Sequence, residues 1–396
     1  MKHFRPRLSR RAFWVLCALL VCLRLALTGF QQAYIWVGGA PLDDELMFRA
    51  ANHITAGQWL GAYDYLTLSK AMFFPVWLAL LHALHLPYLI SGAALWCGAA
   101  LLAVFAFSTL WRKKDTAQGR VLTLGLFAAL AFLPSSWAAY TLRVYRDNIF
   151  PALCLYFFAG MAGMALRAVF TPEKPLWPWL AAAGAGLACG YLDREDAGLF
   201  LLPFAAAATV IVAVVLAGKR RWKALAAQVI PYVMLGVGVL TFCTLNYTHY
   251  GVFALSDFSE GSFAAAMGAM MRVDTDSTAP YLSVPADARE KMYDAVPELE
   301  PLAYWLEEDA QLQNDFRDPN LDDYRAGSFY WAIRRAAQFE GIYADAKTAD
   351  AYWQAVADKI NAACDAGTLP SRTGRRVATS QPISAAYVPS TLAETW

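Results

Sequence analysis

The sequence predicts an all-α polytopic membrane protein with about seven transmembrane helices and juxtamembrane helices, followed by a small helical extracytoplasmic domain. Hydrophobic residues make up 58% of the 396 residues and charged residues only 16%, a balance outside the range of soluble domains. Residues 1–248 hold 21 Lys and Arg against 10 Asp and Glu, whereas residues 249–396 hold 12 against 22. The two regions therefore face different environments, and we divide the chain into residues 1–250 and 251–396.

Apolar runs of about membrane-spanning length recur along the first region. They cover residues 12–30, 88–111, 120–138, 149–167, 176–192, 197–217 and 224–248. Five basic residues precede the first run, so the positive-inside rule predicts a cytoplasmic N-terminus. With seven crossings, the basic clusters Arg112–Lys114 and Lys219–Lys223 also lie inside.

Two segments near the first run are predicted to lie at the outer membrane surface. Apolar positions recur every four residues from Asp44 to Gly57, which is typical of an amphipathic surface helix. Residues 71–86 are apolar but short, and they contain Pro75. Because an odd number of crossings must separate Asp44 from Arg112, residues 71–86 are predicted not to span.

Hydropathy drops from about residue 256 onward, where the pattern becomes that of short amphipathic helices. These helices are expected at residues 286–295, 299–314, 326–341 and 346–366. The acidic excess suits the outer side of the membrane, so residues 251–396 are expected to be extracytoplasmic. The tail from Arg372 to Trp396 shows no pattern of regular structure.

Three outer loops carry ionised side chains at helix ends, namely Asp43–Glu45, Arg146-Asp147 and Asp193–Asp196. A helix cap, an interfacial anchor or an ion pair within the loop accounts for any one of them alone. In a compact bundle, however, the three loop ends would form one outer cavity. Carboxylates there supply a general base or a metal ligand, and arginines recognise phosphate. Lys70 is a further candidate, with a snorkelling interfacial lysine as the alternative.

This order of features resembles the GT-C superfamily of glycosyltransferases, over roughly residues 10–250. Within it the chain is most similar to bacterial protein-mannosyltransferase, aminoarabinose-transferase and RgtA/B/C/D-like enzymes. The resemblance rests on Asp44-Glu45 followed by Met47-Phe48, on Lys70 before an aromatic-proline segment, and on Arg146-Asp147. Members commonly continue with further spans after the seventh, so the chain is expected to be a truncated product or a minimal variant.

The resemblance implies an inverting glycosyltransferase on the outer face of the cell membrane. It would move a sugar from a polyprenyl-phosphate donor to an acceptor hydroxyl on a lipid, glycan or protein. Asp44 would be the general base with Asp43 as its neighbour, and Arg146 and Arg194 would stabilise the phosphate. The further substrate-binding residues are expected to be Lys70, Glu45 and Glu195.

No cofactor is certain, and a divalent cation at Asp147 stays an open alternative. A transporter or flippase for a lipid-linked or anionic solute is the main competing function, and a non-catalytic membrane-anchored binding protein is the third. Ionisable residues at mid-membrane and two related halves would mark a transporter, whereas the charges here cluster at outer ends. The expected partners are the donor, the acceptor and the bilayer, with no nucleic acid.

Overall fold

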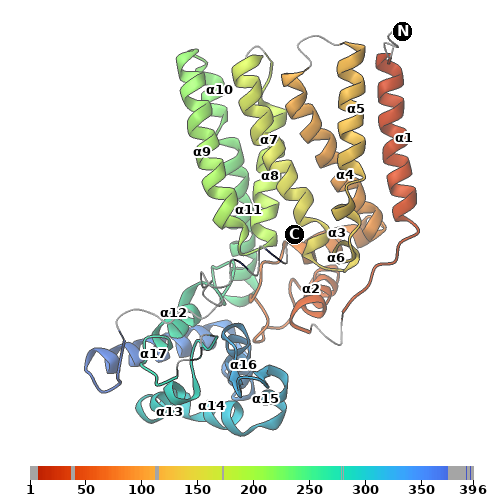
Figure 1. Ribbon diagram of the computed structural model, residues 1–396. Helices are drawn as coiled ribbons and strands as arrows, with labels where there is room; N and C mark the ends of the chain where they lie inside the picture. Colours follow the sequence, from red (N-terminus) through yellow and green to blue (C-terminus); the bar gives the residue numbers. More distant parts are fainter. Residues whose placement is uncertain are drawn as a thin grey trace. The chain divides into compact units, whose positions relative to one another are not determined.

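The computed structural model describes residues 8–36, 41–111, 116–171, 174–277, 279, 281–372, 389 and 393. The chain is 73% helical, so the predicted α class is confirmed (Figure 1). Three features used above lie outside the described residues. They are the basic residues Lys2, Arg5 and Arg7, the cluster Arg112–Lys114, and nearly all of the tail after Arg372.

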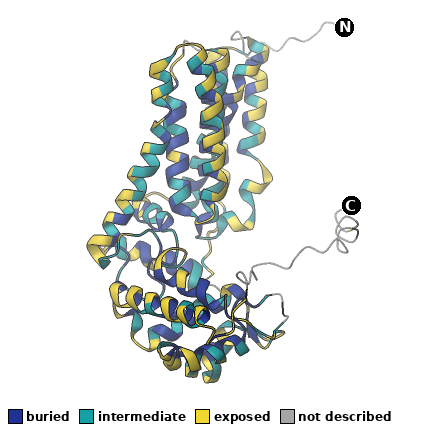
Figure 2. Cartoon of the chain, turned by 90° about the vertical axis from the view of Figure 1, so that its left-hand side faces the viewer, coloured by how far each residue is buried: buried dark blue, intermediate teal, exposed yellow. Residues whose placement is uncertain are grey.

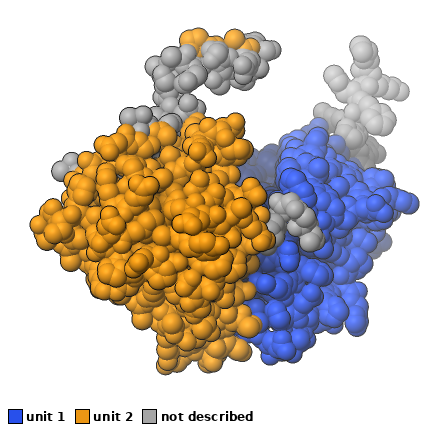
Figure 3. Space-filling view, turned by 90° about the horizontal axis from the view of Figure 1, so that it is seen from below, with its two compact units in different colours: residues 1–61, 70–245 blue, residues 62–69, 246–396 orange. Residues whose placement is uncertain are grey.

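The chain divides into two compact units (Figure 3). Unit 1 comprises residues 1–61 and 70–245, and unit 2 comprises residues 62–69 and 246–396. The main boundary lies close to the expected division at residue 250. The membership of residues 62–69 in unit 2 was outside that expectation. It depends on contacts far along the chain, since Tyr63 donates a hydrogen bond to Asp257 and Arg334 donates one to the Tyr65 carbonyl.

Unit 1 is a bundle of helices that run side by side (Figure 1). Its longer helices are α1 (Arg10–Thr28), α4 (Tyr88–Phe107), α5 (Ala117–Ala131), α7 (Phe150–Phe170), α8 (Trp177–Asp193), α9 (Ala197–Gly218) and α11 (Ile230–Tyr250). Its short helical elements are η2 (Pro41–Glu45), α2 (Leu46–Thr55), α3 (Phe73–Ala83), η3 (Ser108–Leu110), η4 (Pro134–Trp137), α6 (Ala139–Leu142), η5 (Arg146–Asn148) and α10 (Trp222–Ala227).

Five helices in the described part of the chain are long and apolar enough to cross a membrane. They are α1, α4 with η3, α7, α9, and α10 with α11. Their outward faces carry exposed residues along their length (Figure 2), and on α9 these include Leu199 and Val214, which is 70% exposed. Such apolar faces suit lipid rather than water. We therefore treat the chain as a membrane protein with five candidate spans.

Three of the expected runs differ from the structure in length. Helix α5 ends at Ala131 and not near residue 138, because Pro134 opens the separate turn η4 and cannot continue a helix. The expected run 224–248 is two helices, since α10 ends before Pro231 and α11 begins at Ile230. Helix α3 has 11 residues and is roughly 16 Å long, about half the hydrocarbon thickness. This length agrees with the prediction that residues 71–86 do not span.

Small residues let the central helices of unit 1 approach closely. A Cβ atom on Gly186 of α8 would lie 2.5 Å from the Phe157 backbone nitrogen of α7. A Cβ atom on Gly160 of α7 would lie equally close to the Ala183 nitrogen of α8. Without a hydrophobic effect between helices in lipid, this tight packing is what holds a bundle together. It fixes the ends of α7 and α8, from which two of the charged loops extend.

Unit 2 folds around its own core of buried apolar residues, with α12 packed along α17. Its elements are α12 (Gly261–Met270), α13 (Ala286–Ala295), η6 (Pro297–Leu299), α14 (Glu300–Ala303), η7 (Tyr304–Glu308), α15 (Ala310–Phe316), β1 (Arg317–Asp318), β2 (Asp323–Tyr324), α16 (Ala326–Phe339), η8 (Ile342–Ala344) and α17 (Ala346–Asp365). Strands β1 and β2 pair antiparallel.

The four helices expected in unit 2 are present, with one correction and one addition. The run 299–314 is broken, because Asp309 caps a new helix by accepting a hydrogen bond from the Leu312 amide. Helix α12 precedes the four and was not expected. Its apolar residues are buried on several sides, so it lacks the one-sided pattern that marks an amphipathic helix.

Candidate active site

Asp44 lies in the turn η2 directly before α2, and it is completely buried. Its Oδ2 accepts hydrogen bonds from the Trp36 amide at 2.8 Å and from Nε of Arg143 at 3.0 Å. The Nη2 atom of Arg143 donates to the other carboxylate oxygen. Both oxygens of Asp44 are therefore held by a two-point contact with one guanidinium, the strongest common form of ion pair.

Asp43 is adjacent in sequence but differs in exposure, since 37% of its side chain is accessible. Its carboxylate pairs with the Lys70 ammonium and accepts a hydrogen bond from the Tyr145 hydroxyl at 3.0 Å. Burial disfavours the carboxylate, but the hydrogen bonds and charge of Lys70, together with Tyr145, outweigh it and hold the pKa of Asp43 below its usual range. The Asp43 side chain is therefore an ionised carboxylate that is partly accessible to solvent.

Tyr145 links this acid to the second loop. Its hydroxyl accepts a hydrogen bond from Nη2 of Arg146 at 2.8 Å while donating to Asp43. Arg146 is almost buried, and its Nη1 contacts both Glu195 oxygens at 2.8 and 3.0 Å. Nη1 also donates to the Asp193 carbonyl. The chain of contacts from Lys70 to Glu195 thus joins all three loops.

Arg194 forms a second, more exposed pair in the same region. Its Nη1 lies 3.1 Å from Oδ1 of Asp147, and its Nε lies 3.1 Å from Oδ1 of Asp196. About 30% of the side chains of both Arg194 and Asp147 is accessible. Arg194 is therefore the arginine of this group most open to an incoming anion.

Backbone contacts place the second loop against the first. Residues Tyr34 and Arg143 form a parallel bridge in which the Val144 amide donates to the Tyr34 carbonyl at 2.8 Å. The Tyr88 hydroxyl, at the start of α4, donates to the Arg143 carbonyl at 2.8 Å. Helices α2, α3 and α6 lie at this same end of the bundle (Figure 1). The predicted convergence of the three loops is confirmed.

Asp193, the last residue of α8, is fully buried, and neither carboxylate oxygen has a hydrogen-bond partner among the described residues. Asp193 ends its helix at the charged end of the bundle, where its backbone carbonyl accepts a hydrogen bond from Arg146.

Two other expected site residues, Glu45 and Asp147, lie outside the chain of contacts that runs from Lys70 to Glu195. Glu45 is exposed at the start of α2, and the described residues give it no hydrogen bond or ion pair. Asp147 pairs with Arg194, and the described residues contain no cluster of three potential metal ligands. From the sequence, Arg143 received no role in the site, and Tyr145 was considered only as a residue that could stack on a sugar ring. Their place beside Arg146 in one short loop was the available signal, but their partners lie about a hundred positions away.

No family model matches the chain, and comparisons with curated proteins and with solved structures find no significant match. What the site can do chemically therefore follows from its own groups. Asp43 can accept a proton from a hydroxyl, and the nearby cations Lys70, Arg143 and Arg194 can hold a phosphate.

Proposed function

We propose that the chain is an inverting glycosyltransferase of the GT-C type, which transfers a sugar from a polyprenyl-phosphate donor to an acceptor hydroxyl. The observation that carries the proposal is the position of Asp43, an accessible carboxylate held among Lys70, Arg143 and Tyr145 where three loops meet. A base beside several cations suits a reaction in which a hydroxyl loses a proton while a phosphate leaves.

The exposure of the two acids favours Asp43 over Asp44 as the base. Asp44 is fully buried with both oxygens bound, whereas Asp43 is partly accessible. In this proposal Asp44 positions Arg143, and Asp43 takes the proton from the hydroxyl of the acceptor substrate. The acceptor oxygen then bonds to the anomeric carbon from the side opposite the phosphate. The bond from that carbon to the phosphate oxygen breaks, and polyprenyl phosphate leaves with the electron pair.

The two arginines interact with the phosphate in different ways, according to how exposed each of them is. Arg194 is accessible and can turn from Asp147 or Asp196 toward the departing phosphate. Arg146 is nearly buried and held by Glu195, so it supports the site electrostatically without leaving its partners. Asp147 and Glu195 then orient the two arginines. In this proposal, positive charge from both arginines stabilises the negative charge that develops on the phosphate in the transition state.

The proposal also specifies the side of the membrane on which the site lies. Helices α5 and α8 cross in addition to the five candidate spans, giving seven crossings with the N-terminus in the cytoplasm. The site and residues 251–396 are then outside the cell membrane. Nucleotide sugars are cytoplasmic, so a site on the outer face needs a sugar carried on a lipid that has been flipped.

A vesicle assay tests the activity and the sidedness together. Right-side-out membrane vesicles containing the protein would receive a panel of short-chain polyprenyl-phosphate hexoses and an alcohol acceptor. We expect release of polyprenyl phosphate without permeabilisation, and from inverted vesicles only after permeabilisation. Turnover of none of the donors by the protein would contradict the proposed activity, and release from sealed inverted vesicles alone would contradict the sidedness.

A further inference from the structure

A second cationic group, separate from the acid network, is buried in the bundle. Arg24 lies in α1 four residues before its last residue, Thr28, and only 2% of it is exposed. Its Nη2 atom donates to the Ser136 carbonyl at 2.7 Å, and the guanidinium stacks on the Trp137 ring at 3.4 Å from the centroid. These two contacts fix the plane and direction of the guanidinium.

The same contacts leave much of the guanidinium without a partner. Within the described part of the chain, Nε and Nη1 of Arg24 have no hydrogen-bond acceptor, and no ion pair includes this residue. A buried charge without a partner destabilises the folded state. Long basic side chains near helix ends in membranes commonly extend to the interface, but the Ser136 and Trp137 contacts hold Arg24 inside the bundle. The arrangement therefore favours an anion beside Arg24.

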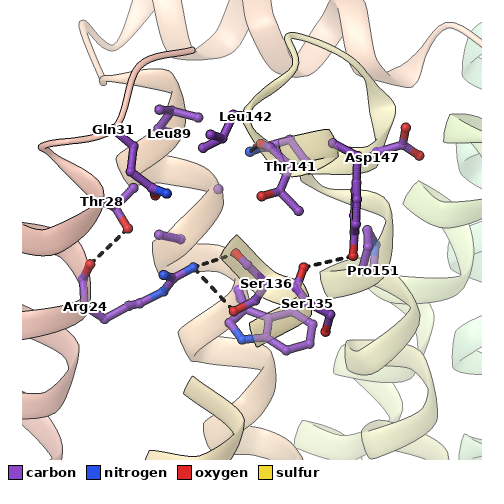
Figure 4. A pocket seen from close by; sticks show the side chains of 15 residues that line it. Arg24, Thr28, Gln31, Leu89, Ser135, Ser136, Thr141, Leu142, Asp147 and Pro151 are labelled. Carbon is purple, nitrogen blue, oxygen red and sulfur yellow. Dashed lines mark hydrogen bonds between the residues drawn. The ribbon is translucent and has the colours of Figure 1, made fainter. Parts of the chain in front are cut away.

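Arg24 is one of the residues that line a small cavity in unit 1, together with Ser135 and Ser136. Figure 4 shows Arg24 reaching from α1 toward Ser136, with Thr141 and Asp147 across the cavity. The lining also includes Asn148, whose Oδ1 is buried and has no partner among the described residues.

Charge in the cavity favours an anion in spite of Asp147. The carboxylate of Asp147 pairs at 3.1 Å with Arg194, which also pairs with Asp196, whereas Arg24 has no ion pair among the described residues. Leu89, Ala93 and Trp96 supply an apolar side to the same cavity. An anionic group joined to an apolar body therefore suits this lining better than an ion alone.

We propose that this cavity binds a phosphate group of a membrane lipid, with Arg24 as its cation. Guanidinium groups pair well with phosphate oxygens, and Arg24 lies one turn from the end of a candidate span, near the depth of lipid headgroups. The acyl chains then continue along the apolar side of the cavity. The site shares only Asp147, at its edge, with the residues assigned to transfer, and its test measures binding rather than transfer.

Thermal melting in an uncharged detergent tests the proposal. The purified full chain would be titrated with short-chain phosphatidylglycerol, with diacylglycerol of the same acyl chains, and with inorganic phosphate. We expect saturable stabilisation by phosphatidylglycerol and little by diacylglycerol. Saturable stabilisation by inorganic phosphate at similar concentration would show that the phosphate alone is bound, and would overturn the lipid assignment.

Variants then tie the stabilisation to Arg24. Arg24→Gln should weaken the apparent affinity for phosphatidylglycerol at least about tenfold, and Arg24→Lys should retain part of it, since one charge-assisted contact is worth roughly this factor. Arg11→Gln, at an exposed arginine of the same helix, is the matched control and should bind as the wild type does. Equal binding by Arg24→Gln and the wild type overturns the proposal. If Arg24→Gln does not fold, equal stabilisation of the wild type by phosphatidylglycerol and diacylglycerol overturns it instead.

Discussion

Asp43→Asn is expected to lower sugar transfer by about a hundredfold or more, because a positioned general base contributes a factor of that size. The substitution keeps the size of the side chain and its place beside Tyr145, but it removes the proton acceptor. Asp43 is partly exposed, and Asn can still accept a hydrogen bond from Lys70. The melting temperature should fall less than for Asp44→Asn, because the mostly buried Lys70 loses the negative charge of Asp43 but keeps a hydrogen-bond acceptor. Release of polyprenyl phosphate by purified variants, measured beside their melting curves, checks both statements.

The control for this loss is Asp294→Asn, an exposed aspartate of unit 2 outside the site. It should transfer sugar as the wild type does. Asp44→Asn distinguishes the two assignments of the base, because it should lower stability more than Asp43→Asn and lower transfer per folded molecule less. Full turnover by Asp43→Asn together with loss of turnover by folded Asp44→Asn would return the role of base to Asp44.

The helical runs of unit 1 were predictable because their signals are local. Apolar composition and nearby breakers such as Pro87 and Pro134 bound the helices, and the structure follows them closely for α4, α7, α8 and α9. The predicted helix boundaries were wrong where a proline interrupts an apolar run, at Pro134 and Pro231. The contribution of residues 62–69 to unit 2 had no local signal, since it depends on Asp257 and Arg334.

The site was predictable in outline but not in its pairs. Runs of charge at helix ends showed which loops would meet, because unpaired charges avoid the hydrocarbon. Which carboxylate takes which cation depends on backbone geometry that the sequence does not display. The bridge between Tyr34 and Arg143 brings that arginine to Asp44, while Lys70 reaches Asp43. Two adjacent acids therefore acquire opposite environments, one buried and one accessible.

Asp44→Ala is expected to destabilise the protein by about 3 kcal/mol, because it leaves the mostly buried Arg143 guanidinium without its principal partner. The Trp36 amide also loses its acceptor. Asp43 remains 3.7 Å from Arg143 and compensates in part, which places the cost at the lower end of values for a broken buried pair. For a unit of this size the melting temperature should fall by roughly 6–12 °C.

A double variant separates the ion pair from simple loss of packing. Arg143→Met removes the charge that Asp44→Ala leaves uncompensated, so Asp44→Ala with Arg143→Met should be more stable than the two single effects predict when added. The coupling should lie within the range of about 0.5–3 kcal/mol found for residues in contact. Melting temperatures of the two single variants and the double variant measure it. Strict additivity would mean that Asp44 stabilises the loop through the Trp36 amide and packing alone. Recovery in the double variant, with Asp43 still in place, would show that Asp44 stabilises the folded site chiefly by holding Arg143.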